Sequence, residues 1–103
     1  VRDDQWHHVA LTWVNTGTNN IKLYVDGVMV GEANYQASGV ISKGGTLVLG
    51  QKQDSLGGGF DNAQKLLGGL DDFAWYGTAL TPQQIAARAR NNKTFVVTVN
   101  DVV

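Results

Sequence analysis

The sequence predicts a mainly antiparallel β protein with one short helix near its C-terminus. Apolar residues recur with a period of two in several segments, the period of a strand that buries one face. The dipeptide Asp26-Gly27 separates two of these segments as a tight turn would, and glycine-rich stretches separate others. Only the segment after Thr81 departs from this period, and it carries a helix start signal.

The first two predicted strands show the alternation most clearly. In residues 8–13, three side chains share one face and the other three share the opposite face, and residues 21–25 repeat the pattern. Asp26-Gly27 favours a tight hairpin turn because both positions tolerate a positive φ, so Val28–Val30 is the expected return strand. The two faces of the first strand are Val9, Leu11 and Trp13 on one side, and His8, Ala10 and Thr12 on the other.

Three later segments are predicted as further strands, and one as a helix. The strands are Thr46–Gly50, Leu70–Tyr76 and Phe95–Val99. The helix begins after Thr81, which is a favourable N-cap residue, and a proline and a glutamine follow at positions that suit a first helical turn. This helix is expected to extend through roughly Arg90.

Composition excludes several classes of function. Eight basic and nine acidic residues give a net charge of -1, so the chain lacks the basic surface with which nucleic-acid-binding proteins neutralise phosphates. No apolar run approaches the roughly 20 residues that span a bilayer, so membrane insertion is not expected. The absence of cysteine excludes disulfides and thiolate zinc sites. At 103 residues the chain is expected to be one globular domain.

The ordered landmarks of the chain resemble those of laminin-G-like domains over about residues 5–90. The similar segments are Trp6–Trp13, Leu23–Gly27, Leu70–Tyr76 and Leu80–Ile85. Residues 49–64 are in addition similar to the calcium loop of pentraxins. The resemblance implies an antiparallel jelly-roll β-sandwich of the concanavalin A-like superfamily, in a protein that is secreted or on the cell surface.

The resemblance also concerns only part of that sandwich. The landmarks belong to its second half, so residues 1–103 are expected to be the C-terminal half of a laminin-G/pentraxin-like domain. An apolar face such as that of Val9, Leu11 and Trp13 needs cover. An omitted N-terminal segment, a second chain or a swapped copy would each supply it.

The resemblance implies four metal-binding residues in one glycine-rich loop. Calcium takes about six to eight oxygen ligands, and the implied donors are Gln53, Asp54, Asp61 and Gln64. Lys52 stands where the family pattern has a bridging glutamate, and an ammonium group cannot ligate a cation. We therefore expect at most one calcium ion. In the structural alternative, this is a glycine-rich surface loop whose Asp and Asn residues serve turn formation.

Catalysis is not expected. The glycosidases of the same superfamily use two carboxylates about 5 Å apart, whereas this chain has a single glutamate, Glu32. His7 and His8 point to opposite faces of a strand and are interpreted as framework, as are Asp71 and Asp72. The aromatic residues are interpreted as core rather than as a sugar-stacking platform. They are Trp13, Phe73, Trp75 and Tyr76.

The sequence thus predicts a non-catalytic extracellular recognition or adhesion module that binds a glycan or another polar ligand through its calcium-type loop. The alternative is a structural spacer or a protein–protein adhesion domain. In that alternative the loop holds no ion, and Lys52 replaces the charge of the ion.

Overall fold

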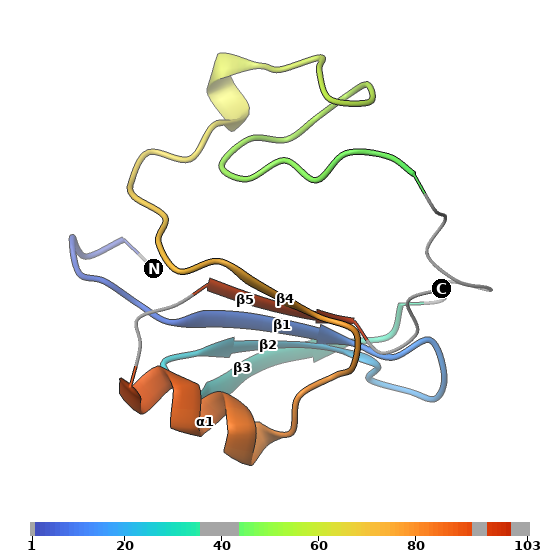
Figure 1. Cartoon of the computed structure of the whole chain (residues 1–103), viewed down its shortest axis with the longest axis vertical. Coiled ribbons are helices and arrows are strands. Elements are labelled where there is room, and N and C mark those ends of the chain that lie inside the picture. The colour runs from blue at the N-terminus through green and yellow to red at the C-terminus, as the bar shows by residue number, and fades with distance from the viewer. Residues whose placement is uncertain (1, 36–43, 92–94, 100–103) are drawn as a thin grey trace.

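The computed structural model describes residues 2–35, 44–91 and 95–99. Its elements follow one another in a sheet-rich order, with one α-helix between the last two strands (Figure 1). They are β1 (Val9–Trp13), β2 (Ile21–Val25), β3 (Val28–Ala33), the 3-10 helix η1 (Asn62–Gln64), β4 (Ala74–Tyr76), α1 (Pro82–Asn91) and β5 (Phe95–Val99).

The described residues form one five-stranded sheet with the order β3-β2-β1-β5-β4. The three strands β1, β2 and β3 are antiparallel, as the sequence predicts, but β5 runs parallel to both β1 and β4. Parallel neighbours need a long crossover connection, usually a helix, and α1 supplies it between β4 and β5. The sheet is therefore mixed.

The predicted hairpin between β2 and β3 is confirmed. Asp26 and Gly27 have φ angles of 50° and 84°, the two positive values that a type I′ turn requires. The turn packs against α1, where a Cβ on Gly27 would lie 3.1 Å from the Cα of Ala86. β3 is longer than expected and forms one edge of the sheet, and all six of its residues are exposed.

The predicted strand Thr46–Gly50 is wrong, because this segment is not a strand in the structure. Glycines with φ angles of 80°, 109° and 79° stand at Gly44, Gly45 and Gly50, and these left-handed conformations interrupt an extended chain at both ends. Beside it, the described residues form an isolated bridge from Gln51 to Lys65.

The predicted strand Leu70–Tyr76 is confirmed only at its end, as β4. Asp72 has a φ angle of 52°, and its backbone N–H donates to Oδ1 of Asp71 at 2.8 Å. A residue in this left-handed conformation ends extended pairing. The two aspartates therefore form a turn into β4, which agrees with their interpretation as structural residues.

The predicted helix is confirmed as α1. The hydroxyl of Thr81 accepts from the backbone N–H of Gln84 at 3.2 Å, and the Gln84 side chain accepts from the backbone N–H of Thr81 at 2.9 Å. This reciprocal pair is a capping box. It fixes the start of a helix that buries Ile85 and Ala89 against the sheet.

The buried core lies between α1 and one face of the sheet (Figure 1). Ala10 and Ile85 are fully buried there, and Arg88 closes one side of the core by placing its guanidinium 4.9 Å from the ring centre of Tyr76. Its Nε also donates to the Tyr76 hydroxyl at 2.9 Å. The core cluster consists of Ala10, Tyr24, Leu80 and Ile85, with Ala74 and Tyr76 packed against it.

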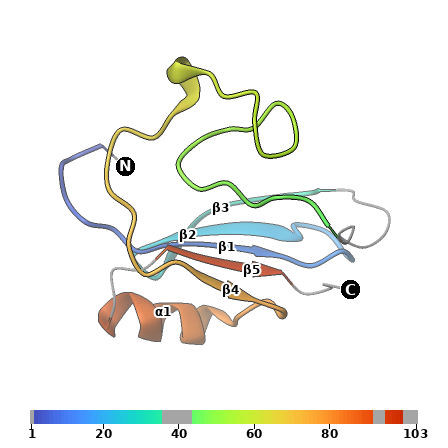
Figure 2. The same ribbon diagram turned by 45° about the horizontal axis from the view of Figure 1, so that its top comes forward.

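The opposite face of the sheet carries the apolar set predicted for β1. Residues 44–73 cross above this face as a long irregular segment, while α1 lies on the other side (Figure 2). Trp13 is 9% exposed and packs edge-on to Tyr35, with ring centres 6.2 Å apart. Leu23 and Trp75 remain 38% and 44% exposed, so the described part of the chain covers this face incompletely.

A buried asparagine ties the ends of the hairpins together. The Asn20 side chain donates to the carbonyl oxygens of Val14 at 2.7 Å and Tyr35 at 2.8 Å, and it accepts from the Tyr35 backbone N–H at 2.7 Å. These three bonds join the β1–β2 connection to the chain that leaves β3. They also hold the tyrosine whose ring covers Trp13.

Candidate functional site

The loop predicted to bind calcium is a compact structure stabilised by its own backbone. Ser55 and Gly58 exchange backbone hydrogen bonds of 2.9 and 3.2 Å, which makes a four-residue turn. Gly59 has a φ angle of 68°, and a Cβ there would lie 2.9 Å from the Ser55 nitrogen. The Gln53 side chain donates to the Thr46 carbonyl at 2.6 Å and accepts from the Gly57 N–H at 2.8 Å.

Asp54 pairs with a cation that belongs to the chain itself. The ammonium group of Lys52 lies 2.9 Å from Oδ1 of Asp54, and both side chains are exposed. Lys52 is also the residue that replaces a carboxylate in the pattern of the resembling family. The Lys52 ammonium group therefore lies next to Asp54, a carboxylate that the resemblance assigns to calcium binding.

Asp61 and Gln64 lie together in a second turn. Asp61 is the N-cap of η1, where its Oδ1 accepts from the Ala63 N–H at 2.9 Å and its carbonyl accepts from the Gln64 N–H at 2.9 Å. The Gln51 side chain donates to the same carbonyl at 3.0 Å. Asp61 thus serves the turn formation that the structural alternative predicts.

Three of the four expected calcium ligands bond to other groups of the chain. Asp54 faces an ammonium group, one carboxylate oxygen of Asp61 caps η1, and the Gln53 side chain bonds the backbone. Within residues 2–35 and 44–91, no group of three or more His, Cys, Asp or Glu side chains could hold a metal ion. Calcium needs about six to eight oxygens around one point, and an ion at this loop would compete with the Lys52 ammonium group for Asp54.

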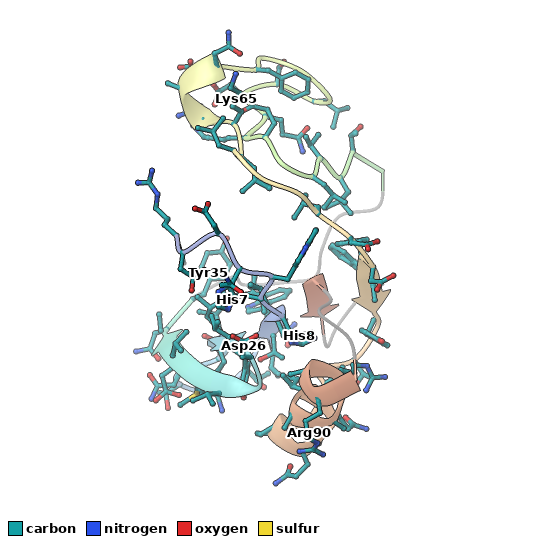
Figure 3. All side chains as sticks on the ribbon, turned by 90° about the vertical axis from the view of Figure 1, so that its left-hand side faces the viewer. His7, His8, Asp26, Tyr35, Lys65 and Arg90 are labelled. Atoms are coloured by element: carbon teal, nitrogen blue, oxygen red, sulfur yellow. The ribbon has the colours of Figure 1, made fainter. Side chains whose placement is uncertain are left out.

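The two histidines lie on opposite sides of the chain, as predicted. His8 is fully buried and lies next to α1, whereas His7 lies between two carboxylates near the β2–β3 turn (Figure 3). Its Nδ1 is 2.6 Å from Oδ2 of Asp26, and its Nε2 is 2.9 Å from Oδ1 of Asp3. Hydrogen bonds to Asp26, and then to Asp3, raise the pKa of His7 above its ordinary value of 6.5.

A cavity of about 710 Å³ lies between residues 2–7 and residues 66–71. Trp6 lines it and is 57% exposed, and its indole lies 3.0 Å from the place of a Cβ on Gly69. Leucines and polar side chains share the wall, a mixture typical of small-ligand pockets. The alternation of residues 8–13 gives no information about Trp6, because β1 begins only at Val9.

The aromatic residues predicted as core differ among themselves. Trp13 is buried and Tyr76 packs against the core cluster, which confirms the interpretation for both. Trp75 is 44% exposed on the incompletely covered face, and its ring centre lies 6.5 Å from that of Phe73.

In the part of the chain that the structure describes, no helix is long and apolar enough to cross a membrane.

Comparison with known proteins gives one family. The Laminin_G_3 family model, described as the concanavalin A-like lectin/glucanases superfamily, matches residues 1–86. This match includes β1 to β4 and the loop at residues 51–64, but it does not include β5. No solved structure matches the chain.

Three similar human proteins illustrate the relationship. Pentraxin-4 is 40% identical over 85 residues, which is 82% of this chain and 18% of that protein. Adhesion G protein-coupled receptor D2 is 44% identical over 84 residues, which is 81% of this chain and 9% of that protein. Neuronal pentraxin-1 is 40% identical over 86 residues, which is 82% of this chain and 20% of that protein. The chain therefore spans a fifth or less of the length of these relatives.

Proposed function

Because this chain belongs to the concanavalin A-like lectin/glucanases superfamily, we propose that it is a non-catalytic, extracellular adhesion module whose loop at residues 51–64 works without calcium. The observation that carries this proposal is the contact of 2.9 Å between Lys52 and Asp54. The similarity to pentraxins and to an adhesion receptor supports the adhesive role. The protein of which this module is part is then secreted or on the cell surface.

The charge of Lys52 explains why the loop needs no metal. A carboxylate next to an ammonium group is already neutralised, and a calcium ion would have to displace that group against repulsion between like charges. The remaining order of the loop comes from backbone bonds at Ser55 and Gly58 and from the Gln53 side chain. The loop therefore has internal stabilisation independent of any ion.

The chemistry of the surface beside the loop supports a polar ligand such as a glycan. The exposed Trp6 indole offers a flat apolar surface, and the polar groups of Arg2, Gln5 and Asp71 line the same cavity. Sugars present both apolar C–H faces and hydroxyl groups, which suit such a mixture. The jelly-roll sandwich of the superfamily remains the proposed context, in which further strands would cover Leu23 and Trp75.

The chain itself offers little for catalysis. Its single glutamate, Glu32, lies on the exposed edge strand β3, away from the loop and the cavity in sequence and in the sheet order. A retaining or inverting glycosidase needs a pair of carboxylic groups on either side of the scissile bond. We propose recognition without turnover.

Calcium titration by calorimetry, together with protease protection of the loop, tests the ion-independent assignment. We expect no calcium response in the wild type and a new response in Lys52→Glu, because that change replaces a repelling cation by a ligand. Lys52→Gln is the matched control, since it removes the charge without adding a carboxylate. Asp54→Asn in the Lys52→Glu background should abolish the gained response.

Calcium binding by the wild type would overturn this assignment and restore the calcium-type loop of Gln53, Asp54, Asp61 and Gln64. A glycan array run with calcium and with a chelator tests the ligand class separately. Glycan binding that is equal under both conditions is expected. No glycan binding under either condition would leave protein–protein adhesion or a spacer role as the function.

A further inference from the structure

The side chain of His7 joins three parts of the molecule. Its two ring nitrogens lie within hydrogen-bond distance of carboxylates from opposite directions, 2.6 Å from Asp26 and 2.9 Å from Asp3. Asp26 belongs to the β2–β3 turn, and its other oxygen accepts from the His8 backbone N–H at 3.0 Å. Asp3 belongs to the segment that forms one wall of the cavity.

Only the doubly protonated imidazole satisfies this geometry. An ionised carboxylate has acceptors and no donor, and neutral imidazole has a single N–H. In the neutral form, one ring nitrogen would therefore turn a lone pair toward a carboxylate oxygen less than 3 Å away. Either Asp3 or Asp26 would have to move.

Asp3 is the partner that is free to move. Asp26 is fixed by its turn, by the contact of Gly27 with α1 and by its bond from the His8 N–H. The carboxylate of Asp3 is bonded to His7 and to the backbone N–H of Gln5, two residues away, and its side chain is 51% exposed. Loss of the proton from His7 therefore frees the segment of Asp3 rather than the turn.

The charges around His7 favour its protonated form. Arg2, Asp3, Asp4 and Asp71 line the same cavity, so carboxylates exceed the one arginine there. On the other side, α1 contacts the turn through Ala86 and Ala89, and its Arg88 is bonded to Tyr76. Hydrogen bonding to His7 in turn lowers the pKa of Asp3 below its ordinary value of 3.8.

We propose that His7 is a pH-dependent clamp, which in its charged form holds residues 2–6 as a wall of the cavity and in its neutral form releases them. Trp6 connects the clamp to the cavity, because its indole lies against Gly69 on the opposite wall. Release of the segment withdraws this indole. The cavity then has both walls at mildly acidic pH and loses one of them at alkaline pH.

The pH range in which the clamp is formed follows from the pKa shifts of His7 and Asp3. The His7 pKa is raised in the folded protein, so its contribution is fully present below 6.5 and is lost as pH rises through the raised value. The Asp3 pKa is lowered, so its contribution is present above 3.8 and is lost as pH falls through the lowered value. The clamp is therefore complete between about pH 4 and 6.5.

NMR spectroscopy of the full chain tests the proposal without any ligand. The His7 ring signals give its pKa, and the chemical shift of the Trp6 indole N–H, assigned with Trp6→Phe, reports the position of the wall. We expect this chemical shift to change with the same midpoint as the titration of His7. In His7→Gln the chemical shift should show no such midpoint.

A matched pair of variants separates the clamp from a general effect of charge. Asp3→Asn removes one clamp partner, so we expect the midpoint to move to lower pH. Asp4→Asn removes the same charge one residue away, at a position where asparagine tolerates the φ angle of 60°, and should leave the midpoint near that of the wild type. The amide spectrum of β1 and β2 shows in each variant whether the fold is retained.

Three results would overturn the clamp. A His7 pKa at or below 6.5 would contradict the bonded geometry. Equal shifts of the midpoint in Asp3→Asn and Asp4→Asn would show a general effect of charge and no specific clamp. A Trp6 indole chemical shift that does not follow the titration of His7 would show that the wall does not depend on the clamp. None of these results depends on calcium or glycan binding, so they leave the proposed function unaffected.

Discussion

The two faces of the sheet are held in different ways, although the same strands form both. On the face toward α1, small and aromatic side chains are buried by a capped helix, and Ala10 and Ile85 are fully buried. On the face toward residues 44–73, larger apolar side chains meet an irregular segment, and Leu23 and Trp75 stay 38% and 44% exposed. The face that is richer in hydrophobic residues is thus the less buried one.

The difference shows that burial follows the element that covers a face, not the hydropathy of the face alone. α1 presents a continuous apolar stripe that includes Ile85 and Ala89, and a helix of ten residues can lie flat on a sheet. Residues 44–73 have few backbone ladder contacts and many exposed leucines, so they add little to a second core. Stability should therefore depend on the two faces unequally.

The largest effect is expected from emptying the helix-side core. Ile85→Ala should lower the free energy of unfolding by about 3 kcal/mol, because a fully buried aliphatic side chain leaves a cavity. Leu23→Ala on the opposite face is the control and should cost about 1 kcal/mol, since that side chain is already partly in water. Urea denaturation measures both. Equal losses would contradict the unequal burial of the faces.

A smaller effect is expected from the polar link at the end of the sheet. Asn20→Ala should cost about 2 kcal/mol, because it removes three part-buried hydrogen bonds to Val14 and Tyr35. Asn20→Asp keeps the shape but turns a carboxylate toward two carbonyl oxygens, so its cost should increase with pH above the pKa of that new group. Thermal unfolding at several pH values distinguishes the two variants.

The smallest effect is expected at the start of α1. Thr81→Ala should lower the free energy of unfolding by about 1 kcal/mol through loss of the capping hydroxyl. Thr81→Ser keeps an oxygen at this position and should behave like the wild type. Chemical denaturation checks the stability, and the His7 titration should be unchanged in both variants. A shift of that titration would show that helix capping extends its influence to the clamp.

Local signals predicted the antiparallel part of the fold and the helix. Period-two alternation indicated β1 and β2, Asp26-Gly27 indicated the turn, and Thr81 with Gln84 indicated the start of α1. Pairing between distant strands could not be predicted in this way, because the residues of a strand do not specify whether its neighbour is parallel. The position of β5 between β1 and β4 is of this kind.

The candidate site was less predictable than the fold. The resemblance to pentraxins indicated the loop, and the charge of Lys52 indicated that the loop differs from that of pentraxins. The contact of Lys52 with Asp54 depends on three-dimensional geometry, which the sequence alone does not give. His7 gave no signal of its own, since Asp26 is distant in sequence and Asp3 lies before the strand. Contacts between side chains that lie far apart in sequence can be identified only in the folded structure.

The position of β5 has a consequence for how the molecule assembles. β1, β2 and β3 are consecutive and can pair soon after they are made, but in the sheet of the described residues β1 and β4 are joined through β5, which follows α1 in sequence. Contacts between distant parts of a chain form late, because a long loop must close first. During synthesis, the inner edge of β1 therefore stays unpaired until β5 has been made, and we expect the hairpins to form first.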